Sequence, residues 1–449
     1  MSSSAISRPS KSVEIVRRWV PAAVVTVVVL TIAAGLINHF RRGVDLGSAL
    51  PPFLMSWTPH VRWPAAIALA LAVGCACAAP WAIERVRSGP AFAALGYAMT
   101  LAVGLSVGAA RLGTAGWSHV FDLGPGGAFE ARFEYLPALP ALHRGVAYYV
   151  GHFSQLLPEL PTHTKGNPPG PLVAMHLLGL TTPGRLAAAC VVVGSLVTPL
   201  TYALGRSLGG CARSSVGVER RARVATAFAA FSPCVLVYGF TSVDFVFAAM
   251  AAAVACLLVS RRMPLVAFGC VAAGIAAFFS WVLLAIPAWA VVVVLVRDGR
   301  GAAVRLAVLS AAGVLGVTLV LAAVWGYDPI AIFRAVHHAY RMGLSAQRPY
   351  PFWLFGSPAA WLTLLGPPIV WLALRSLQRG EPAAVALAVV IVISAVSGFT
   401  KAETERIWLP YVPLACVAAA ATPIVRLRAA LVAMALAAVV VKVLFGTVW

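Results

Sequence analysis

Apolar residues run along this chain in long blocks, and short polar loops between the blocks carry most of the charge. A block of about 17 to 25 apolar residues is long enough to cross the hydrocarbon core of a bilayer as a helix. The pattern therefore predicts an all-α, polytopic transmembrane bundle of about 11–13 spans. The predicted spans lie at roughly 19–38, 63–83, 90–110, 184–204, 224–240, 242–259, 264–280, 282–296, 303–325, 354–373, 383–399, 407–423 and 428–447.

Two polar segments between the spans are long, at 112–170 and 326–353. The first contains short amphipathic stretches, such as the one around Tyr148, Tyr149 and Phe153, which we expect to lie flat at the membrane interface. No internal repeat divides the chain. We therefore expect a tail at 1–18 followed by a single transmembrane domain at 19–447.

The basic residues predict the orientation, because loops rich in Lys and Arg stay on the cytoplasmic side. Basic residues precede the first span, so the N-terminus is expected to be cytoplasmic, and both long polar segments then face the outside. Arg41 and Arg42 disagree, because they follow the first span. The basic residues that agree are Arg8, Lys11, Arg17 and Arg18 before the first span, and Arg85, Arg87, Arg206 to Arg223, Arg261, Arg262, Arg297, Arg300, Arg375, Arg379, Arg426 and Arg428 in later inner loops.

Composition agrees with a multi-pass protein of the cell membrane. Of the 449 residues, 61% are hydrophobic and only 11% are charged, whereas a soluble domain carries roughly a quarter charged residues. The net charge of +20 belongs to the short loops, so we interpret it as a topology signal and expect no nucleic-acid partner. The eight cysteines lie mostly inside apolar blocks and are expected to serve packing.

The fourteen acidic residues are unevenly placed, since nine of them fall at or beyond the predicted outer face. Ionisable groups near membrane depth are costly and are functional candidates by default. Most outer bases and histidines share the same segments, which suggests a site for a charged, hydroxyl-rich ligand. The nine are Asp45, Asp122, Glu130, Glu134, Glu159, Asp244, Asp328, Glu403 and Glu405.

Three segments concentrate this chemistry. Phe133–Pro137 precedes by about thirty residues a stretch that runs from His163 through Lys165 and Asn167 to Pro168-Pro169, where the double proline excludes a continuing helix. Asp244 opens an apolar span, and Lys401–Pro410 places four charges before another. Each segment also has a purely structural alternative. The first two could be a rigid turn with exposed polar residues and an N-terminal helix cap at Asp244, and the third could be a solvated loop.

At these residues the chain resembles the GT-C superfamily of membrane glycosyltransferases, above all its actinobacterial members that act on mannosylated or arabinosylated envelope polymers. The resemblance is carried by Glu134-Tyr135, His163 to Pro169, Arg185-Leu186 through Tyr202 to Arg206, Ser232-Pro233 and Glu405-Arg406. It covers 112–260 best. The chain departs from the family pattern in having two additional spans before the large loop, and in reducing the frequent acidic pair to Phe133-Glu134.

The resemblance implies an inverting transfer of mannose or arabinose from a polyprenyl-phosphate carrier to an envelope glycan or glycolipid on the outer face. Such a transfer needs a carboxylate base for the acceptor hydroxyl and cations for the leaving phosphate. Glu134 is the expected base and Asp122, beside a glycine-rich turn, its competitor. The expected substrate-binding residues are Tyr135, His163, Lys165, Asn167, Asp244, His337, Arg341, Lys401, Glu403, Glu405 and Arg406.

No cofactor is expected, because the chain has neither a nucleotide-binding glycine loop nor an Asp-x-Asp metal motif. A divalent metal is compatible with the sequence but not indicated by it. The main alternative function is a transporter or flippase of a lipid-linked envelope precursor, which would place polar groups near the membrane midplane. A non-catalytic envelope-assembly protein and another lipid-phosphate transferase also stay open.

Overall fold

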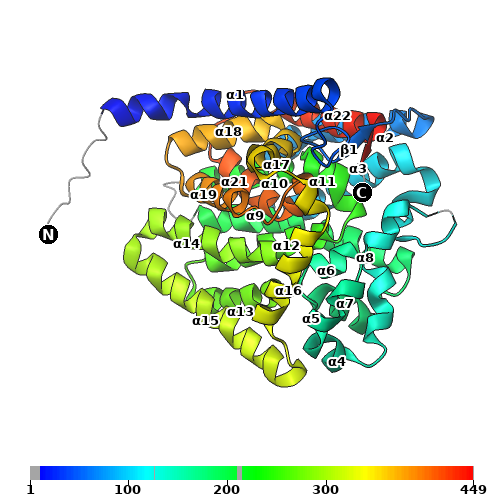
Figure 1. Cartoon of the computed structure of the whole chain (residues 1–449). Coiled ribbons are helices and arrows are strands. Elements are labelled where there is room, and N and C mark those ends of the chain that lie inside the picture. Colours follow the sequence, from blue (N-terminus) through cyan, green and yellow to red (C-terminus); the bar gives the residue numbers. More distant parts are fainter. Residues whose placement is uncertain (1–10, 126, 210–214, 448–449) are drawn as a thin grey trace.

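The computed structural model describes residues 11–125, 127–209 and 215–447. Helices make up nearly all the regular structure of these residues, and the two short strands, β1 (Met55–Trp57) and β2 (Phe445–Thr447), form one antiparallel pair. Most of the helices lie alongside one another in one bundle, with α1 (Lys11–Arg42) along its upper edge in Figure 1. The prediction of an all-α polytopic bundle is confirmed. The first ten residues of the predicted tail lie outside the described residues, and α1 covers the rest.

Seven helical segments of the described chain are long and apolar enough to cross a bilayer, and all seven coincide with predicted spans. Pro183–Leu208 joins α8 (Pro183–Gly194) and α9 (Val197–Leu208), and Trp281–Asp298 joins η6 (Trp281–Leu284) and α14 (Ala285–Asp298). The other five are Trp19–Arg42 within α1, α2 (Trp63–Arg85), α3 (Gly89–Leu112), α15 (Arg300–Trp325) and α22 (Leu427–Leu444).

Two further predicted spans are bent helix pairs, which raises the count to nine if each pair is one span. The first pair, α10 (Ser215–Phe231) with α11 (Pro233–Tyr238) and η5 (Gly239–Thr241), bends by 42°. The second, α17 (Tyr350–Leu365) with α18 (Pro367–Gln378), bends by 112°. Each bend has a local cause, because Pro233 and Pro367 lack the N–H that would continue the preceding helix, and Gly366 has a φ of +112°.

The last four predicted spans fall on apolar helices of 10–17 residues, so helix length alone supports fewer crossings than thirteen. These helices are α12 (Asp244–Leu258), α13 (Met263–Phe279), α19 (Pro382–Ser397) and Leu409–Ala420, which joins η8 (Leu409–Tyr411) and α21 (Val412–Ala420).

The surface of the bundle is apolar where a soluble protein would be polar. On α15 the side chains of Val304, Val308, Leu315, Leu319 and Val324 are each about three-fifths exposed. An exposed apolar stripe along a whole helix would be unfavourable in water but suits contact with lipid tails. Together with the long apolar helices, this surface indicates a multi-pass membrane protein.

The two long polar segments fold into short helices at one end of the bundle (Figure 1). In the second segment, α16 (Pro329–Met342) is capped by Asp328, whose side chain accepts from the amides of Ile330 and Ala331. It is followed by η7 (Leu344–Gln347), and α20 (Thr404–Ile407) lies in a later loop. The first segment comprises η1 (Gly113–Phe121), η2 (Phe129–Phe133), η3 (Leu136–Leu142), α4 (Val146–Gly151), α5 (Phe153–Leu156), η4 (Leu157–Glu159), α6 (Thr162–Gly166) and α7 (Gly170–Leu177).

A cluster of buried aromatic rings fixes the base of α20. Trp361 of α17 lies edge-on to Trp408 and Tyr411, with ring centroids 5.9 and 6.3 Å apart, and all three side chains are buried. The indole N–H of Trp408 donates to the hydroxyl of Thr400 at 3.2 Å. Large rings bury much apolar area and few of their torsions are free, so this cluster holds the charged turn at 401–406 at a fixed place over α17.

Hydrogen bonds also relate the ends of successive helices. Arg348, just before α17, donates to the carbonyl of Lys401, just after α19, at 2.7 Å. The two residues therefore lie at the same end of the bundle, so any crossing made by α17 and α18 must be matched by a return through α19. A re-entrant α17–α18 pair would leave α19 without a crossing, so the tenth and eleventh predicted spans depend on each other.

The orientation of the bundle stays a prediction, and two exposed positions test it. Gln347 lies in the second long polar segment, and Val425, 97% exposed, lies between α21 and α22. In a background without the native cysteines, we expect Cys at 347 to react with a membrane-impermeant thiol reagent in intact cells. Cys at 425 should react only after permeabilisation. The opposite pattern would reverse the predicted orientation.

Candidate functional site

Five charged or titratable side chains from distant parts of the chain meet at one end of the bundle. Glu134 directly follows η2, His163 lies in α6, and Asp244 is the first residue of α12. Glu403 and Arg406 come from the turn that contains α20. We refer to these five residues as the Glu134 cluster.

The Arg406 guanidinium lies at the centre of the Glu134 cluster and is 4% exposed. It lies 3.2 Å from Glu403 Oε2, 3.4 Å from Asp244 Oδ2 and 3.8 Å from Glu134 Oε1. Burial alone would lower the pKa of Arg406, but the three surrounding carboxylates, led by Asp244, raise it. Arg406 is therefore a permanent cation that compensates three acids in a place that excludes water.

His163 joins Arg406 to Glu134. A terminal nitrogen of Arg406 lies 3.0 Å from Nε2 of His163, and the other lies 3.5 Å from Nδ1. Because a guanidinium can only donate, Nε2 is the acceptor in the shorter contact and the ring proton resides on Nδ1. Nδ1 lies 3.0 Å from Glu134 Oε1, so the ring bridges the guanidinium and the carboxylate.

Glu134 is the most isolated member of the cluster. Its side chain is 1% exposed, and neither carboxylate oxygen receives a well-directed hydrogen bond from the described residues. The nearest contacts of His163 and Arg406 are to Oε1, and Oε2 is buried without a hydrogen-bond donor among the described residues. A buried carboxylate oxygen without a donor is unfavourable, so this oxygen is suited to receive a proton or a hydrogen bond from a bound hydroxyl.

Asp244 is held by its own helix start. The hydroxyl of Ser242 donates to Asp244 Oδ2 at 2.8 Å, and the Asp244 amide donates back to that hydroxyl at 3.0 Å. A carboxylate in the first turn of a helix also interacts favourably with the helix dipole. The alternative interpretation as a helix cap and the functional one are therefore both compatible with its position, since the same carboxylate contacts Arg406.

The turn that supplies Glu403 and Arg406 is strained. Ala402 and Glu403 have φ values of +63° and +59°, in the left-handed region that non-glycine residues rarely adopt. Arg348 holds the turn through Glu403 Oε1 at 3.3 Å and the Lys401 carbonyl. The Lys401 amide donates to the hydroxyl of Tyr340 in α16 at 3.0 Å. Although burial opposes it, Arg406 and Arg348 lower the pKa of Glu403, which stays ionised.

A second polar chain supports the cluster from the side of Tyr135. The Ser280 hydroxyl donates to Asn167 Oδ1 at 2.7 Å, and the Asn167 amide donates to the Tyr135 hydroxyl at 2.9 Å. Burial and the carboxylates of Asp244 and Glu134 raise the pKa of Tyr135 well above its usual range, so it stays a phenol. Its own O–H is then available as a donor within the site.

Glu405 points away from Arg406, towards the loop before β1. Its Oε1 accepts the amide of Leu54 at 2.9 Å, and its Oε2 is buried and accepts no hydrogen bond from the described residues. Burial raises the pKa of Glu405 to about 7. Glu405 is thus a neighbour of the cluster that ties the segment at 54 to α20.

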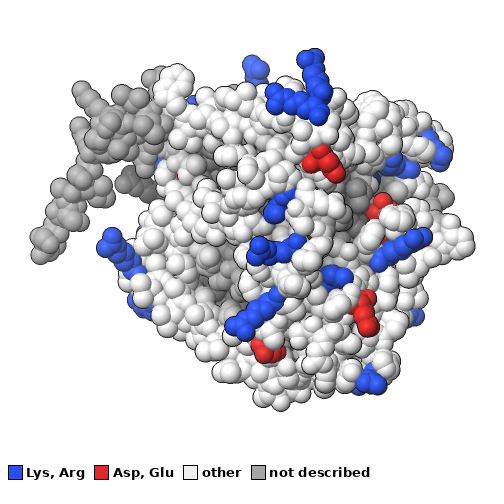
Figure 2. All heavy atoms as spheres, viewed as in Figure 1, with Lys and Arg blue, Asp and Glu red and all other residues white. Residues whose placement is uncertain are grey.

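Basic residues surround the acidic cluster at the surface. Figure 2 shows several basic side chains down the middle of the viewed face, where Figure 1 places α16. Arg341 is exposed and has no carboxylate partner among the described residues, and Lys165 donates only to the carbonyl of Pro158 at 3.3 Å. Lys401 Nζ donates to the carbonyls of Ser345 and Arg348, at 3.0 and 3.2 Å.

Most of the predicted site residues therefore lie at one end of the bundle, but two are used differently. Asp122 accepts the amide of Gly124 in its own turn at 2.9 Å, and no contact with the cluster is found among the described residues. His337 stacks on Phe333 and meets Phe399 edge-on, as part of an aromatic cluster. Neither position adds a group to the surroundings of Glu134.

Four residues of the site were missed. Arg348 was one of many outer bases, and nothing in its local sequence distinguishes it. Ser280 and Ser242 flank apolar helices, where hydroxyls are common. Leu54 contributes only its backbone. For Arg348, Ser280 and Leu54 the contacts are tertiary, because each residue lies far along the chain from the group that it contacts.

Tyr202 to Arg206, which contribute to the family resemblance, belong to a different ion cluster from the Glu134 cluster. Glu219 of α10 accepts from the Tyr202 hydroxyl at 2.7 Å, pairs with Arg223 at 2.7 Å, and pairs with Arg206. A small ion cluster of this kind ties α9 to α10.

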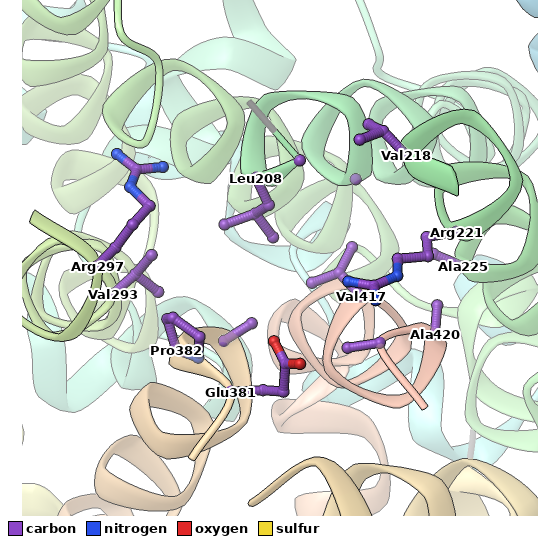
Figure 3. Close-up of a pocket in the computed structure, with 14 residues that line it drawn as sticks. Leu208, Val218, Arg221, Ala225, Val293, Arg297, Glu381, Pro382, Val417 and Ala420 are labelled. Carbon is purple, nitrogen blue, oxygen red and sulfur yellow. The ribbon is translucent and has the colours of Figure 1, made fainter. Parts of the chain in front are cut away.

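A cavity of about 90 Å³ lies between α9, α10, α14, α19 and α21. Figure 3 shows Arg221 and Glu381 pointing into it, while Arg297 points away to its partner Asp298, 2.8 Å distant. None of its lining residues is a predicted site residue. Among the described residues no group of three or more His, Cys, Asp or Glu side chains is placed to hold a metal ion.

The chain has no match among protein-family models, curated proteins or solved structures. The function must therefore be argued from the site itself.

Arg406 should carry much of the stability at this end of the bundle. Arg406→Ala leaves buried carboxylates without their cation, which typically costs about 3–5 kcal/mol. We expect a large fall in the thermal unfolding midpoint of the detergent-solubilised protein. Arg341→Ala is the matched control, because Arg341 is exposed, and its effect should be within about 0.5 kcal/mol. Equal midpoints for the two variants would contradict this arrangement.

Glu405 should make the stability depend on pH. Its pKa is raised from 4.5 unfolded to about 7 folded, so the folded state binds the proton more tightly. Stability is then fully present below about pH 4.5 and is lost as pH rises through 7, by on the order of 3 kcal/mol. Glu405→Gln keeps the acceptor for Leu54 and removes the titration. Unfolding midpoints measured from pH 5 to 8 should fall less in this variant than in the wild type, and parallel curves would refute the assignment.

Proposed function

We propose that the protein is a glycosyltransferase that moves a sugar from a polyprenyl-phosphate carrier to a hydroxyl of an envelope glycan or glycolipid. The observation that carries the proposal is the buried Glu134 carboxylate, whose Oε1 is the oxygen nearest to His163 and whose Oε2 lacks a hydrogen-bond donor among the described residues. An acceptor hydroxyl at Oε2 would supply the missing donor. It would also place its proton within reach of a base.

The reaction follows from this placement. Glu134 takes the proton of the acceptor hydroxyl as its oxygen bonds to the anomeric carbon of the sugar. The bond between that carbon and the phosphate oxygen breaks on the opposite face, so the configuration inverts and polyprenyl phosphate leaves. His163, held by Arg406 at 3.0 Å, keeps the Glu134 carboxylate in a fixed orientation. Tyr135, Asp244 and Glu403 are suited to bind sugar hydroxyls.

The leaving phosphate needs cations that are not already compensated. Arg406 faces three carboxylates, so a phosphate that approaches it would also approach those anions. Lys165, Arg341 and Lys401 at the surface have no carboxylate partner among the described residues, and charge-assisted contacts to phosphate are strong. We therefore assign the phosphate to these surface cations and a positioning role to Arg406.

The membrane setting fits a lipid-linked donor. A prenyl chain needs an apolar environment, and the exposed apolar faces of the bundle provide one. The sugar is mannose or arabinose by the resemblance to GT-C transferases, and the site faces the outside by the distribution of basic loops. No cofactor is required by this mechanism. A transporter of the same lipid-linked precursor would move the sugar carrier without forming a new glycosidic bond.

The decisive experiment combines a donor screen with the loss of the base. Purified protein is incubated with polyprenyl-phosphate mannose or arabinose and envelope acceptors, and the products are followed by mass spectrometry. Glu134→Gln keeps the shape of the side chain and removes its basicity, so turnover should fall by about 10²–10⁴-fold while folding and donor binding persist. Asp122→Asn is the control and should leave turnover near that of the wild type.

Two outcomes would redirect the proposal. If Asp122→Asn loses turnover and Glu134→Gln does not, the base is Asp122 and the assignment of Glu134 is wrong. If the wild type forms no glycosidic product with either donor but reconstituted vesicles translocate the lipid-linked sugar, the protein is a transporter.

A further inference from the structure

Lys442 is a cation buried inside an apolar helix. It lies in the last turn of α22, and its side chain is 2% exposed. Its Nζ donates to the carbonyl of Val237 in α11 at 3.2 Å and to the Thr447 hydroxyl at 3.4 Å. Both partners are neutral. A charged lysine at membrane depth is costly without an anion, so its counterion calls for an explanation.

A second cation lies beside it. Arg111, in the last turn of α3, donates to the Thr58 carbonyl at 3.0 Å and to the Thr58 hydroxyl at 2.8 Å. Thr58 follows β1, whose partner strand β2 directly follows the helix of Lys442. Neither Lys442 nor Arg111 pairs with an Asp or Glu in the part of the chain that the structure describes. Two positive charges therefore lie among hydroxyl groups, and no carboxylate side chain of the described residues balances them.

Gly446 brings these groups close together. A Cβ atom at this position would lie 2.6 Å from the Thr58 hydroxyl, 2.9 Å from the Ser56 hydroxyl and 3.3 Å from a terminal nitrogen of Arg111. Any larger side chain would thus displace the hydroxyls and the guanidinium. The absence of a side chain at 446 lets the two hydroxyls and Arg111 gather against the backbone of β2.

We propose that Lys442 and Arg111, with the hydroxyls of Ser56, Thr58 and Thr447, bind the phosphate group of a membrane phospholipid. Phosphate supplies the missing negative charge and enough acceptor oxygens for two cations and several hydroxyls. Nothing in this assignment depends on the glycosyltransferase reaction.

The surroundings favour a lipid over a free anion as the source of the phosphate. Trp57, Val61 and Trp63 lie next to Thr58 in the chain, and each is at least three-fifths exposed. Exposed tryptophans at the ends of apolar helices are typical of the membrane interface, where phospholipid headgroups lie. The acyl chains of a bound phospholipid would then extend along α2, α3 and α22, which pack together.

Retention of lipid by the purified, delipidated protein tests this site. The probes are dioleoyl phosphatidylglycerol, dioleoylglycerol with the same chains but no phosphate, and inorganic phosphate. The purification tag follows Trp449, so that the chain carries no free carboxylate at that position. We expect native mass spectrometry to show retained phosphatidylglycerol but no dioleoylglycerol, and phosphatidylglycerol to raise the unfolding midpoint more than inorganic phosphate does.

Three variants remove the site in different ways. Lys442→Met and Arg111→Gln each remove a charge, and Gly446→Ala displaces the Ser56 and Thr58 hydroxyls while leaving both charges in place. Each should weaken phosphatidylglycerol binding at least tenfold, whereas Arg111→Lys should restore part of it. Arg375→Gln is the control, because Arg375 is an exposed cation whose hydrogen bond is to Gln378, and it should bind as the wild type does.

The outcomes are distinguishable even if Lys442→Met fails to fold, because Arg111→Gln and Gly446→Ala act at the surface of the same site. Wild-type binding in both variants would overturn the proposal. Equal stabilisation by inorganic phosphate and phosphatidylglycerol would overturn the assignment to a lipid and leave a free-anion site.

Discussion

The contact between Arg406 and three carboxylates is the interaction on which this end of the molecule depends. Glu134, Asp244 and Glu403 come from three separate segments, and a single buried guanidinium lies within 3.8 Å of all of them. Three acids at this separation would repel one another in a medium that screens charge poorly. Arg406 converts that repulsion into a link between the polar loop at 112–170, the start of α12 and the turn at 401–406.

The backbone strain of the turn at 401–406 is related to the need to place Arg406 among these carboxylates. Ala402 and Glu403 adopt left-handed backbone conformations that cost on the order of 1–3 kcal/mol each. Trp361, Trp408 and Tyr411 hold the turn from below, and Arg348 and Tyr340 hold it from above. The packing therefore determines the backbone, and the backbone places Glu403 and Arg406 on the same side of the turn.

Acidic and basic residues occupy different depths at this end of the bundle. Acids lie in the interior around Arg406, and cations without acidic partners among the described residues, such as Arg341, lie at the surface. A transfer from a lipid phosphate to a hydroxyl needs both environments side by side, because the base is a carboxylate whereas the leaving phosphate is stabilised by cations. The segment from Leu54 to Thr58 connects this site to the Lys442 site, since Leu54 binds Glu405 and Thr58 binds Arg111. Lipid bound at the Lys442 site would therefore contact the same segment, Leu54 to Thr58, that contacts α20.

The sequence by itself determined the class of the protein and the positions of its helices. Apolar blocks must be shielded from water whatever the tertiary arrangement, so hydropathy located a helix for every predicted span. The concentration of acids in a few polar segments also pointed to Glu134, His163, Asp244, Glu403 and Arg406, because charge is expensive near a membrane.

Only the tertiary structure decided how these residues are used. Asp122 and Glu134 share one loop and one chemistry, yet the first caps its own turn and the second lies buried beside His163. Arg348 and Lys442 gave no local signal, since the Lys401 carbonyl is 53 residues away from Arg348 and the Val237 carbonyl is 205 residues away from Lys442. Hydropathy records how apolar a segment is, but contacts between distant segments are set by the way in which the whole bundle closes.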